Sequence, residues 1–182
     1  RLTLQGPVQK NKSSFIISGR RTYVDVLSKP FFKEDNAFSG SGYYFYDLTT
    51  KINYRISDND RLYLSGYFGR DVFTFANSDN DIGIGIPWGN ATTSLRWNHL
   101  FSDKLFMNTS LIFSDYRFEF NINQSDFELK IFSGINDWNT KVDFLYQPNQ
   151  RHTIKFGTNY TYHEFTPGNA SGKAGDVVFE PD

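Results

Sequence analysis

The chain has 182 residues, a formal net charge of -1 and no cysteine. A nearly neutral chain lacks the basic surplus typical of nucleic-acid-binding domains, and a chain without cysteine holds neither disulfides nor thiolate metal sites. The mean hydropathy is -0.51, and no run approaches the roughly 18 consecutive apolar residues of a membrane-spanning helix, so helical membrane spans are also excluded.

The first predicted elements are two short strand segments, residues 2–4 and 15–17, joined by a polar link at residues 6–13. The next segment, residues 43–56, alternates with a period of two. Because successive strand residues point to opposite sides, one face of this segment is apolar and the other carries charge. The apolar face has aromatic residues at both ends and aliphatic or small residues between them. This arrangement is typical of the lipid-facing side of a membrane β-barrel strand.

The same alternation recurs towards the C-terminus. Further strands are predicted at residues 61–72, 91–98, 105–122, 138–146 and 152–162. Within residues 105–122 the apolar phase changes after Phe113, so we expect a β-bulge near Ser114 and Asp115. No segment repeats at helical spacing. The positions predicted to face lipid near the middle of a bilayer are Leu48, Thr50, Ile52, Leu64, Leu95, Leu111, Val142 and Phe156.

The lengths of the connections predict an orientation. Short turns of about four residues are expected near Ser57, Ser102 and Gln147. Long links rich in Gly, Asn, Asp and Ser are expected at residues 24–42, at residues 71–89 and after Phe165. In outer-membrane barrels, short turns face the periplasm and long loops face the outside. We therefore expect residues 58–60 in the periplasm and residues 78–81 outside the cell.

These strands, about eight in number, predict an all-β fold, namely a partial transmembrane antiparallel up-and-down β-barrel. Residues 1–182 are expected to be a fragment of a single outer-membrane barrel domain, since the chain opens within a strand and ends in a polar stretch, residues 169–182. The alternative is a soluble all-β carbohydrate-binding module of jelly-roll type, in which the apolar faces form a sandwich core. The aromatic residues at both ends of the apolar faces favour the barrel.

Several stretches of the chain match a known pattern in order. They are LQGPVQK (residues 4–10), SFIISGRRTY (14–23), YYFYDL (43–48), LRWNH (95–99) and YTYHEFTPG (160–168). Together they resemble the barrel of TonB-dependent outer-membrane receptors of the Bacteroidetes type, and the resemblance covers nearly the whole chain. It implies a barrel of about 22 strands in the outer membrane of a Gram-negative bacterium, closed by a plug domain that this chain lacks.

The same resemblance implies a function and partners. The receptor would import a siderophore, haem, cobalamin, a glycan or a peptide with energy from the TonB complex. Its partners would be outer-membrane lipid and lipopolysaccharide, its own plug and remaining strands, the TonB complex and a surface lipoprotein, with no nucleic acid.

Charged residues on the face opposite the apolar one are the main candidates for contact with a ligand or a plug, because a charge without water or a partner is costly. They are Arg20, Asp47, Lys51, Arg55, Arg96, Lys141, Asp143 and Lys155. Pairing with a plug or with one another explains most of these charges better than ligand contact. Aromatic residues of the expected outer loops, Phe31, Phe73, Phe75 and Trp88, are alternative ligand contacts, since exposed rings stack on sugars and planar chelates. Loop packing explains them equally well.

No motif indicates an enzyme, a cofactor or a metal site. The histidines, His99, His152 and His163, lie on different predicted strands without the spacing of a zinc site. Two of Asp115, Glu119 and Glu128 could form a glycosidase pair, but charges above a membrane more often contact water or lipopolysaccharide sugars. We therefore expect no catalytic residue and no cofactor.

Overall fold

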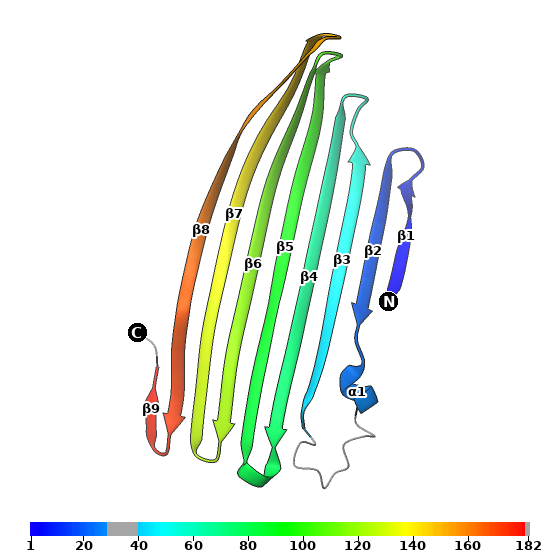
Figure 1. Ribbon diagram of the computed structural model, residues 1–182. Helices are drawn as coiled ribbons and strands as arrows, with labels where there is room; N and C mark the ends of the chain where they lie inside the picture. The colour runs from blue at the N-terminus through cyan, green and yellow to red at the C-terminus, as the bar shows by residue number, and fades with distance from the viewer. Residues whose placement is uncertain (29–39, 181–182) are drawn as a thin grey trace.

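The computed structural model describes residues 1–28 and 40–180, which form one β-sheet with two short helical segments (Figure 1). The strands are β1 (Leu2–Gln9), β2 (Ser13–Arg21), β3 (Gly42–Arg55), β4 (Asp60–Asn77), β5 (Ile82–Ser102), β6 (Leu105–Gln124), β7 (Phe127–Asn149), β8 (His152–Ala174) and β9 (Val177–Phe179). The helical segments are α1 (Val24–Ser28) and the 3-10 turn η2 (Ser78–Asn80). No helix in this part of the chain has the length and apolar character needed to cross a membrane.

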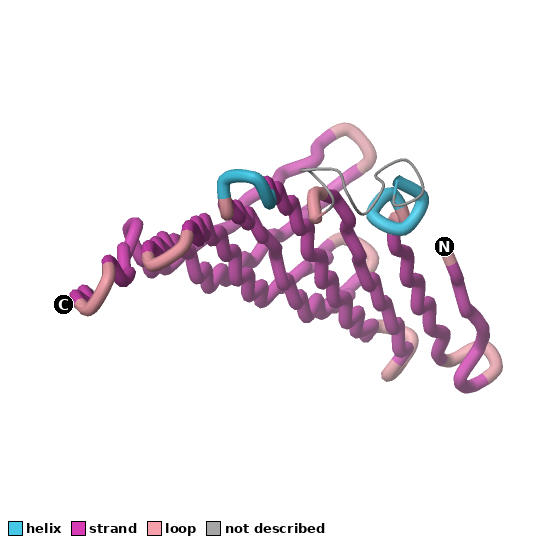
Figure 2. Tube along the Cα trace, turned by 90° about the horizontal axis from the view of Figure 1, so that it is seen from below, coloured by secondary structure: helices cyan, strands magenta, loops and turns pink. Residues whose placement is uncertain are grey.

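The strands form a nine-stranded antiparallel sheet in which each strand pairs with its neighbours in sequence. The tube view shows the described strands as a single curved layer (Figure 2). Met107, at 8% exposure, is the one buried apolar side chain among the described residues. The predicted all-β up-and-down architecture is confirmed. The jelly-roll alternative is wrong, because a sandwich needs a second sheet packed on the first.

Two ends of the sheet differ in their connections. At one end, the turn end, short links at residues 10–12, 56–59, 103–104 and 150–151 join consecutive strands. The other end, the α1 end, holds α1 and η2 together with short links at residues 125–126 and 175–176 (Figure 1). Turn residues Asn11 and Asp81 have φ values of 61° and 49°, a region that Asn and Asp tolerate better than most residues because their short side chains bond to the local backbone.

The structure corrects the predicted long links. Residues 71–89, predicted as a loop, form the paired ends of β4 and β5, with η2 at the tip. The polar stretch after Phe165 continues β8 to Ala174 and then forms β9. Glycine and asparagine disfavour strands in isolation, but here the cross-strand hydrogen bonds of a continuous sheet outweigh that preference. Strand β9 lies in this stretch, which explains why the sequence predicts about eight strands.

The predicted bulge near Ser114 and Asp115 is also wrong. Strand β6 keeps one register with β5 from Ile82 opposite Gln124 to Leu100 opposite Phe106, and the register shifts only next to Ser102. Its register with β7 is unbroken. The apolar phase therefore changes along a regular strand, so that apolar residues change from one face of the sheet to the other.

One face of the sheet, which we call the belt face, carries an exposed apolar belt. Its register runs from Ile52 through Leu64 and Leu95 to Leu111. The belt residues are Tyr46, Leu48, Ile52, Tyr54, Leu64, Phe68, Leu95, Trp97, Leu111, Phe113, Trp138, Val142, Phe144, Tyr146, Ile154, Phe156, Tyr160 and Tyr162. Aromatic residues mark both edges, and neighbouring rings touch, as between Phe113 and Trp138 with centroids 4.6 Å apart. The positions predicted to face lipid all lie on the belt face, so the prediction that they share one face of the sheet is confirmed.

Candidate functional site

The opposite face has a polar zone in its turn-end half. One continuous row there, in cross-strand order, consists of Asn53, Tyr63, Arg96, Ser110, Lys141 and Asn159. Alternation places every charged candidate predicted from the sequence on this face. Strand pairing alone therefore lines up side chains that are more than a hundred residues apart in the chain.

Some cations of the polar zone form ion pairs within the sheet, and others do not. Arg20 forms an ion pair with Asp47 and lies 5.0 Å from the centre of the Phe45 ring. The Nζ of Lys141 lies 3.1 Å from a carboxylate oxygen of Asp143. These paired groups neutralise one another within the wall.

Arg55 pairs with Asp58 at the turn end, outside the centre of the zone. Within the described residues, Lys51, Arg96 and Lys155 have no ion-pair partner. Arg61, on the same face, also has no ion pair with a described residue. These four cations are available to carboxylates from outside the chain, since a charge in a partly covered position needs water or an opposite charge.

The α1-end half of the same face is an apolar zone. Its residues are Tyr43, Phe73, Phe75, Ile84, Ile86, Trp88, Phe118, Phe120, Ile122, Leu129, Ile131 and Ile135, and adjacent strands bring them together as cross-strand partners. The aliphatic residues and Phe118 are partly exposed. An apolar wall of this kind, left partly open on one side of a single sheet, is a surface for contact with another apolar group.

Phe73, Phe75 and Trp88, predicted in an outer loop, lie instead on β4 and β5 within the apolar zone. Trp88 stacks on Tyr43, with centroids 6.4 Å apart and ring planes 23° from parallel. The Tyr43 hydroxyl donates a hydrogen bond to Asp71, and this bond raises the pKa of Tyr43 above its ordinary value. The fourth predicted loop aromatic, Phe31, lies outside the described residues.

Most of the apolar zone was not predicted from the sequence. The signal was the change of phase after Phe113, which places Phe118 and Ile122 on the opposite face once β6 is taken as regular. The predicted bulge would have left these residues on the belt face, so an apolar zone on the opposite face was not expected.

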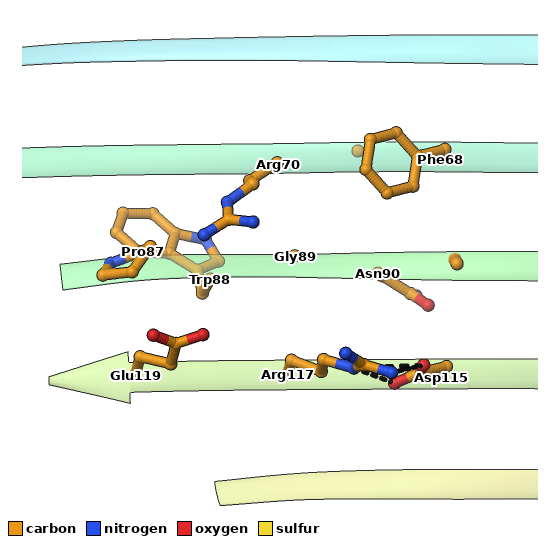
Figure 3. A pocket seen from close by; sticks show the side chains of 11 residues that line it. Phe68, Arg70, Pro87, Trp88, Gly89, Asn90, Asp115, Arg117 and Glu119 are labelled. Carbon is orange, nitrogen blue, oxygen red and sulfur yellow. Dashed lines mark hydrogen bonds and ion pairs between the residues drawn. The ribbon is translucent and has the colours of Figure 1, made fainter. Parts of the chain in front are cut away.

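The belt face changes from apolar to charged at the level where the opposite face changes from polar to apolar. Beyond the belt towards the α1 end it carries Arg70, Asp115, Arg117, Glu119 and Lys130. Arg117 pairs with Asp115 at 2.8 Å and Lys130 with Glu119 at 3.6 Å. A hollow of about 290 Å³ lies between β4 and β6 over Gly89 (Figure 3). The two faces therefore exchange polarity along the strands, and this exchange defines the α1-end edge of the belt.

Two histidines and several carboxylates of the described residues lie in separate pairs. No group of three or more His, Cys, Asp or Glu residues there could hold a metal ion. His99 lies 2.6 Å from Asp60 at the turn end, while His163 pairs with Asp137 on the opposite face. Of the three carboxylates considered for a glycosidase pair, Asp115 and Glu119 form ion pairs with Arg117 and Lys130.

An antiparallel sheet in chain order, with an exposed apolar belt on one face and a polar zone on the other, is the architecture of a segment of an outer-membrane β-barrel wall. Among solved structures, the ferric yersiniabactin uptake receptor FyuA from Yersinia pestis matches 97% of this chain, with a TM-score of 0.64 and 13% sequence identity. The chain spans 31% of the length of that receptor. The fold is therefore that of part of a TonB-dependent receptor barrel. No family model and no curated protein sequence matches the chain.

Proposed function

We propose that this chain is part of the barrel wall of a TonB-dependent outer-membrane receptor, which binds a scarce nutrient and imports it with energy from the TonB complex. The observation that carries the proposal is the match of 97% of the chain to an uptake receptor. The chain supplies binding and containment to this process and no catalytic group.

The belt face supports a membrane location. On β8 the belt runs from Ile154 to Tyr162, which agrees with the roughly 9–11 residues that a tilted strand needs to cross a bilayer. Aromatic residues at both edges suit the two interfaces of the membrane. In this proposal the belt face contacts the lipid of a Gram-negative outer membrane, the α1 end lies outside the cell and the turn end lies in the periplasm.

The polar zone supports an enclosed plug domain. Lys51, Arg96 and Lys155 face the barrel interior in this arrangement, where carboxylates of a plug would pair with them. The ion pairs of Arg20 with Asp47 and of Lys141 with Asp143 need no outside partner. The plug would therefore be held by a minority of the charged residues on this wall.

The apolar zone is the surface that a ligand entering from outside would meet first. Trp88 and Phe118 are cross-strand partners there and offer ring faces for stacking. A siderophore, haem, cobalamin, a glycan or a peptide could each present a ring or an apolar group to this surface. The Bacteroidetes type and the surface lipoprotein partner of the proposal rest on the sequence resemblance.

The experiment uses the full-length receptor gene in its own host, with growth limited in turn by each of the five nutrient classes. Growth on one class should require both the receptor and TonB. Trp88→Ala should raise the nutrient concentration needed for half-maximal growth by about tenfold, as expected for loss of a stacking contact of about 1.4 kcal/mol. Trp138→Ala, on the belt face, is the matched control and should leave that concentration unchanged. Growth that is equal with and without TonB on every class would refute the proposal.

A further inference from the structure

A single carboxylate lies among aromatic rings on the face opposite the belt face. Phe45 lies opposite Asp71, Asp71 opposite Trp88, and Trp88 opposite Phe118. The row crosses β3, β4, β5 and β6, which lie side by side (Figure 1). Because directly opposed residues of antiparallel strands have Cβ atoms roughly 5 Å apart, the rings of Phe45 and Trp88 flank the carboxylate on both sides. We call Tyr43, Phe45, Asp71, Trp88 and Phe118 the Asp71 cluster.

Asp71 is the one charged residue among the described strand positions at the α1 end of this face. From the row of Phe45 to that end of the strands, the other described positions of the face carry apolar or uncharged polar residues. The cation of the neighbouring row, Arg20, forms an ion pair with Asp47. The negative charge of Asp71 is therefore not compensated within the described part of this face.

The carboxylate of Asp71 has capacity for a further partner. Its Oδ1 accepts a hydrogen bond from the Tyr43 hydroxyl, and it forms no ion pair with a described residue. An ionised carboxylate has about four lone-pair positions on its two oxygens, so most of its capacity to accept hydrogen bonds is unused. Asp71 is also partly covered, and a partly covered charge requires water or an opposite charge.

The rings around Asp71 favour a cation as this partner. The Tyr43 ring stacks on Trp88 with centroids 6.4 Å apart, and its centroid lies 6.2 Å from that of Phe45. The face of an aromatic ring attracts an ammonium or guanidinium group within about 6 Å, most strongly for Trp. Arg20 makes this contact with Phe45, at 5.0 Å from the ring centre. No cation of the described residues lies over the ring of Trp88 or Phe118.

The cation that fits the Asp71 cluster is organic. A single carboxylate does not supply the several oxygen ligands that a calcium or magnesium ion requires, and no group of three or more His, Cys, Asp or Glu residues in the described chain could hold a metal ion. The surrounding apolar zone, with Phe73, Ile86 and Phe120 in the next row, is suited to contact with an apolar group. A ligand that combines a protonated amine with an apolar body matches both features.

We propose that the apolar zone binds a nutrient through a protonated amine of that nutrient, with Asp71 as the ion-pair partner and the Trp88 ring as the cation–π partner. This inference rests on the proposed function, in which this face lines the interior of the receptor and the α1 end is outside. The same carboxylate repels an anionic ligand, such as haem with its propionate groups. The charge of the ligand is therefore selected on this wall by one residue among apolar ones.

The test uses the full-length receptor, purified in neutral detergent, and isothermal titration calorimetry with peptide probes. The amine probe is a tripeptide of phenylalanine, leucine and lysine with an amidated C-terminus. The neutral probe is the same peptide with both amines acetylated, and the anionic probe has an acetylated N-terminus and glutamate in place of lysine. The amine probe should bind about tenfold more tightly than the neutral probe, as expected for charge-assisted hydrogen bonds, and the anionic probe should bind most weakly. Added salt should weaken the binding of the amine probe and leave that of the neutral probe unchanged.

Asp71→Asn should lower the affinity for the amine probe to that for the neutral probe, since asparagine still accepts a hydrogen bond from Tyr43 but carries no charge. Asp143→Asn is the matched control, because it removes a carboxylate of the same face that already pairs with Lys141, and it should leave the affinity unchanged. Heat-modifiable migration in gels should show every variant to be folded. Equal affinity for the amine and neutral probes, no measurable binding of the amine probe, or an unchanged affinity in Asp71→Asn would overturn the proposal.

Growth assays distinguish this inference from the proposed function. A receptor that imports a nutrient with TonB but shows no preference for the amine probe would refute the amine site alone. A receptor that binds the amine probe through Asp71 but supports no TonB-dependent growth would refute the transport function alone.

Discussion

At the scale of single residues, position along a strand decides which solvent a side chain meets. Ile52 is 43% exposed on the belt face although it is apolar, while Thr49 on the same strand belongs to the opposite face. Contact with lipid favours an apolar side chain such as isoleucine and disfavours a charged one. Replacing residues of the two faces by the same charged residue therefore tests the assignment.

Ile52→Arg should lower the free energy of unfolding of the full-length protein by about 2–4 kcal/mol, since Ile52 lies near the middle of the belt. Thr49→Arg should cost much less, because its side chain reaches the polar interior. The measurement is reversible urea unfolding in lipid vesicles. An equal loss for the two variants would mean that the faces have been assigned wrongly.

Gly157 on β8 shows how closely the strands approach one another. A Cβ atom built there would overlap the backbone oxygen of Val142 and lie 3.0 Å from the Cα of Asp143. Gly157→Ala should therefore destabilise the folded protein by about 1–3 kcal/mol through overpacking. Gly168→Ala on the same strand is the control, since its Cβ would meet only Ile131, at 3.6 Å. A larger loss at Gly168 than at Gly157, measured in the same urea titration, would contradict this packing.

At the scale of elements, the strands extend well past the belt. The predicted strand at residues 43–56 agrees with β3 to within one residue at each end, because its alternation is strong and aromatic and β-branched residues favour strands. Residues 71–89 could not be assigned in the same way. Gly83, Gly85 and Gly89 weaken the local strand signal, and only pairing with β4 and β6, which is a property of the whole sheet, makes this segment a strand.

One part of the candidate site was likewise predictable from the sequence, and the other part was not. The charged residues of the polar zone were predictable from alternation, since alternation places them on the face opposite the apolar residues. The apolar zone was not predictable, because it depends on the two faces exchanging polarity beyond the belt. In the proposed barrel this exchange marks the depth at which the lipid ends, and no local sequence pattern marks that depth.

The two ends of the hairpins should differ in their access from outside the cell. Cysteines placed at Asp79 in η2 and at Asn59 in the turn before β4 lie at opposite ends of β4, and both native side chains are exposed. An impermeant maleimide added to intact cells should label the cysteine at 79 and not the one at 59. Lysed cells should give labelling at both positions, which controls for reactivity. Labelling of intact cells at 59 alone would reverse the orientation.

At the scale of the whole molecule, the described residues form one sheet whose apolar side chains are mostly exposed. Met107 is the one buried apolar side chain among the described residues, while Leu111 is 50% exposed and Trp138 is 60% exposed. A single sheet also has two edges whose backbone groups seek partners. Expressed alone in water, residues 1–182 should therefore form aggregates. A monodisperse monomer with a cooperative thermal transition in the absence of detergent would contradict the account of the fold.

The three tryptophans of this chain provide the most direct test that the belt face contacts lipid. Trp97 and Trp138 lie near the two edges of the belt, and Trp88 lies on the opposite face. In the full-length receptor, with all other tryptophans replaced by phenylalanine, each one is measured alone in vesicles of lipids brominated on their acyl chains, which quench fluorescence on contact. Strong quenching is predicted for Trp97 and Trp138 and little for Trp88. Quenching of Trp88 with none of Trp97 and Trp138 would contradict the account.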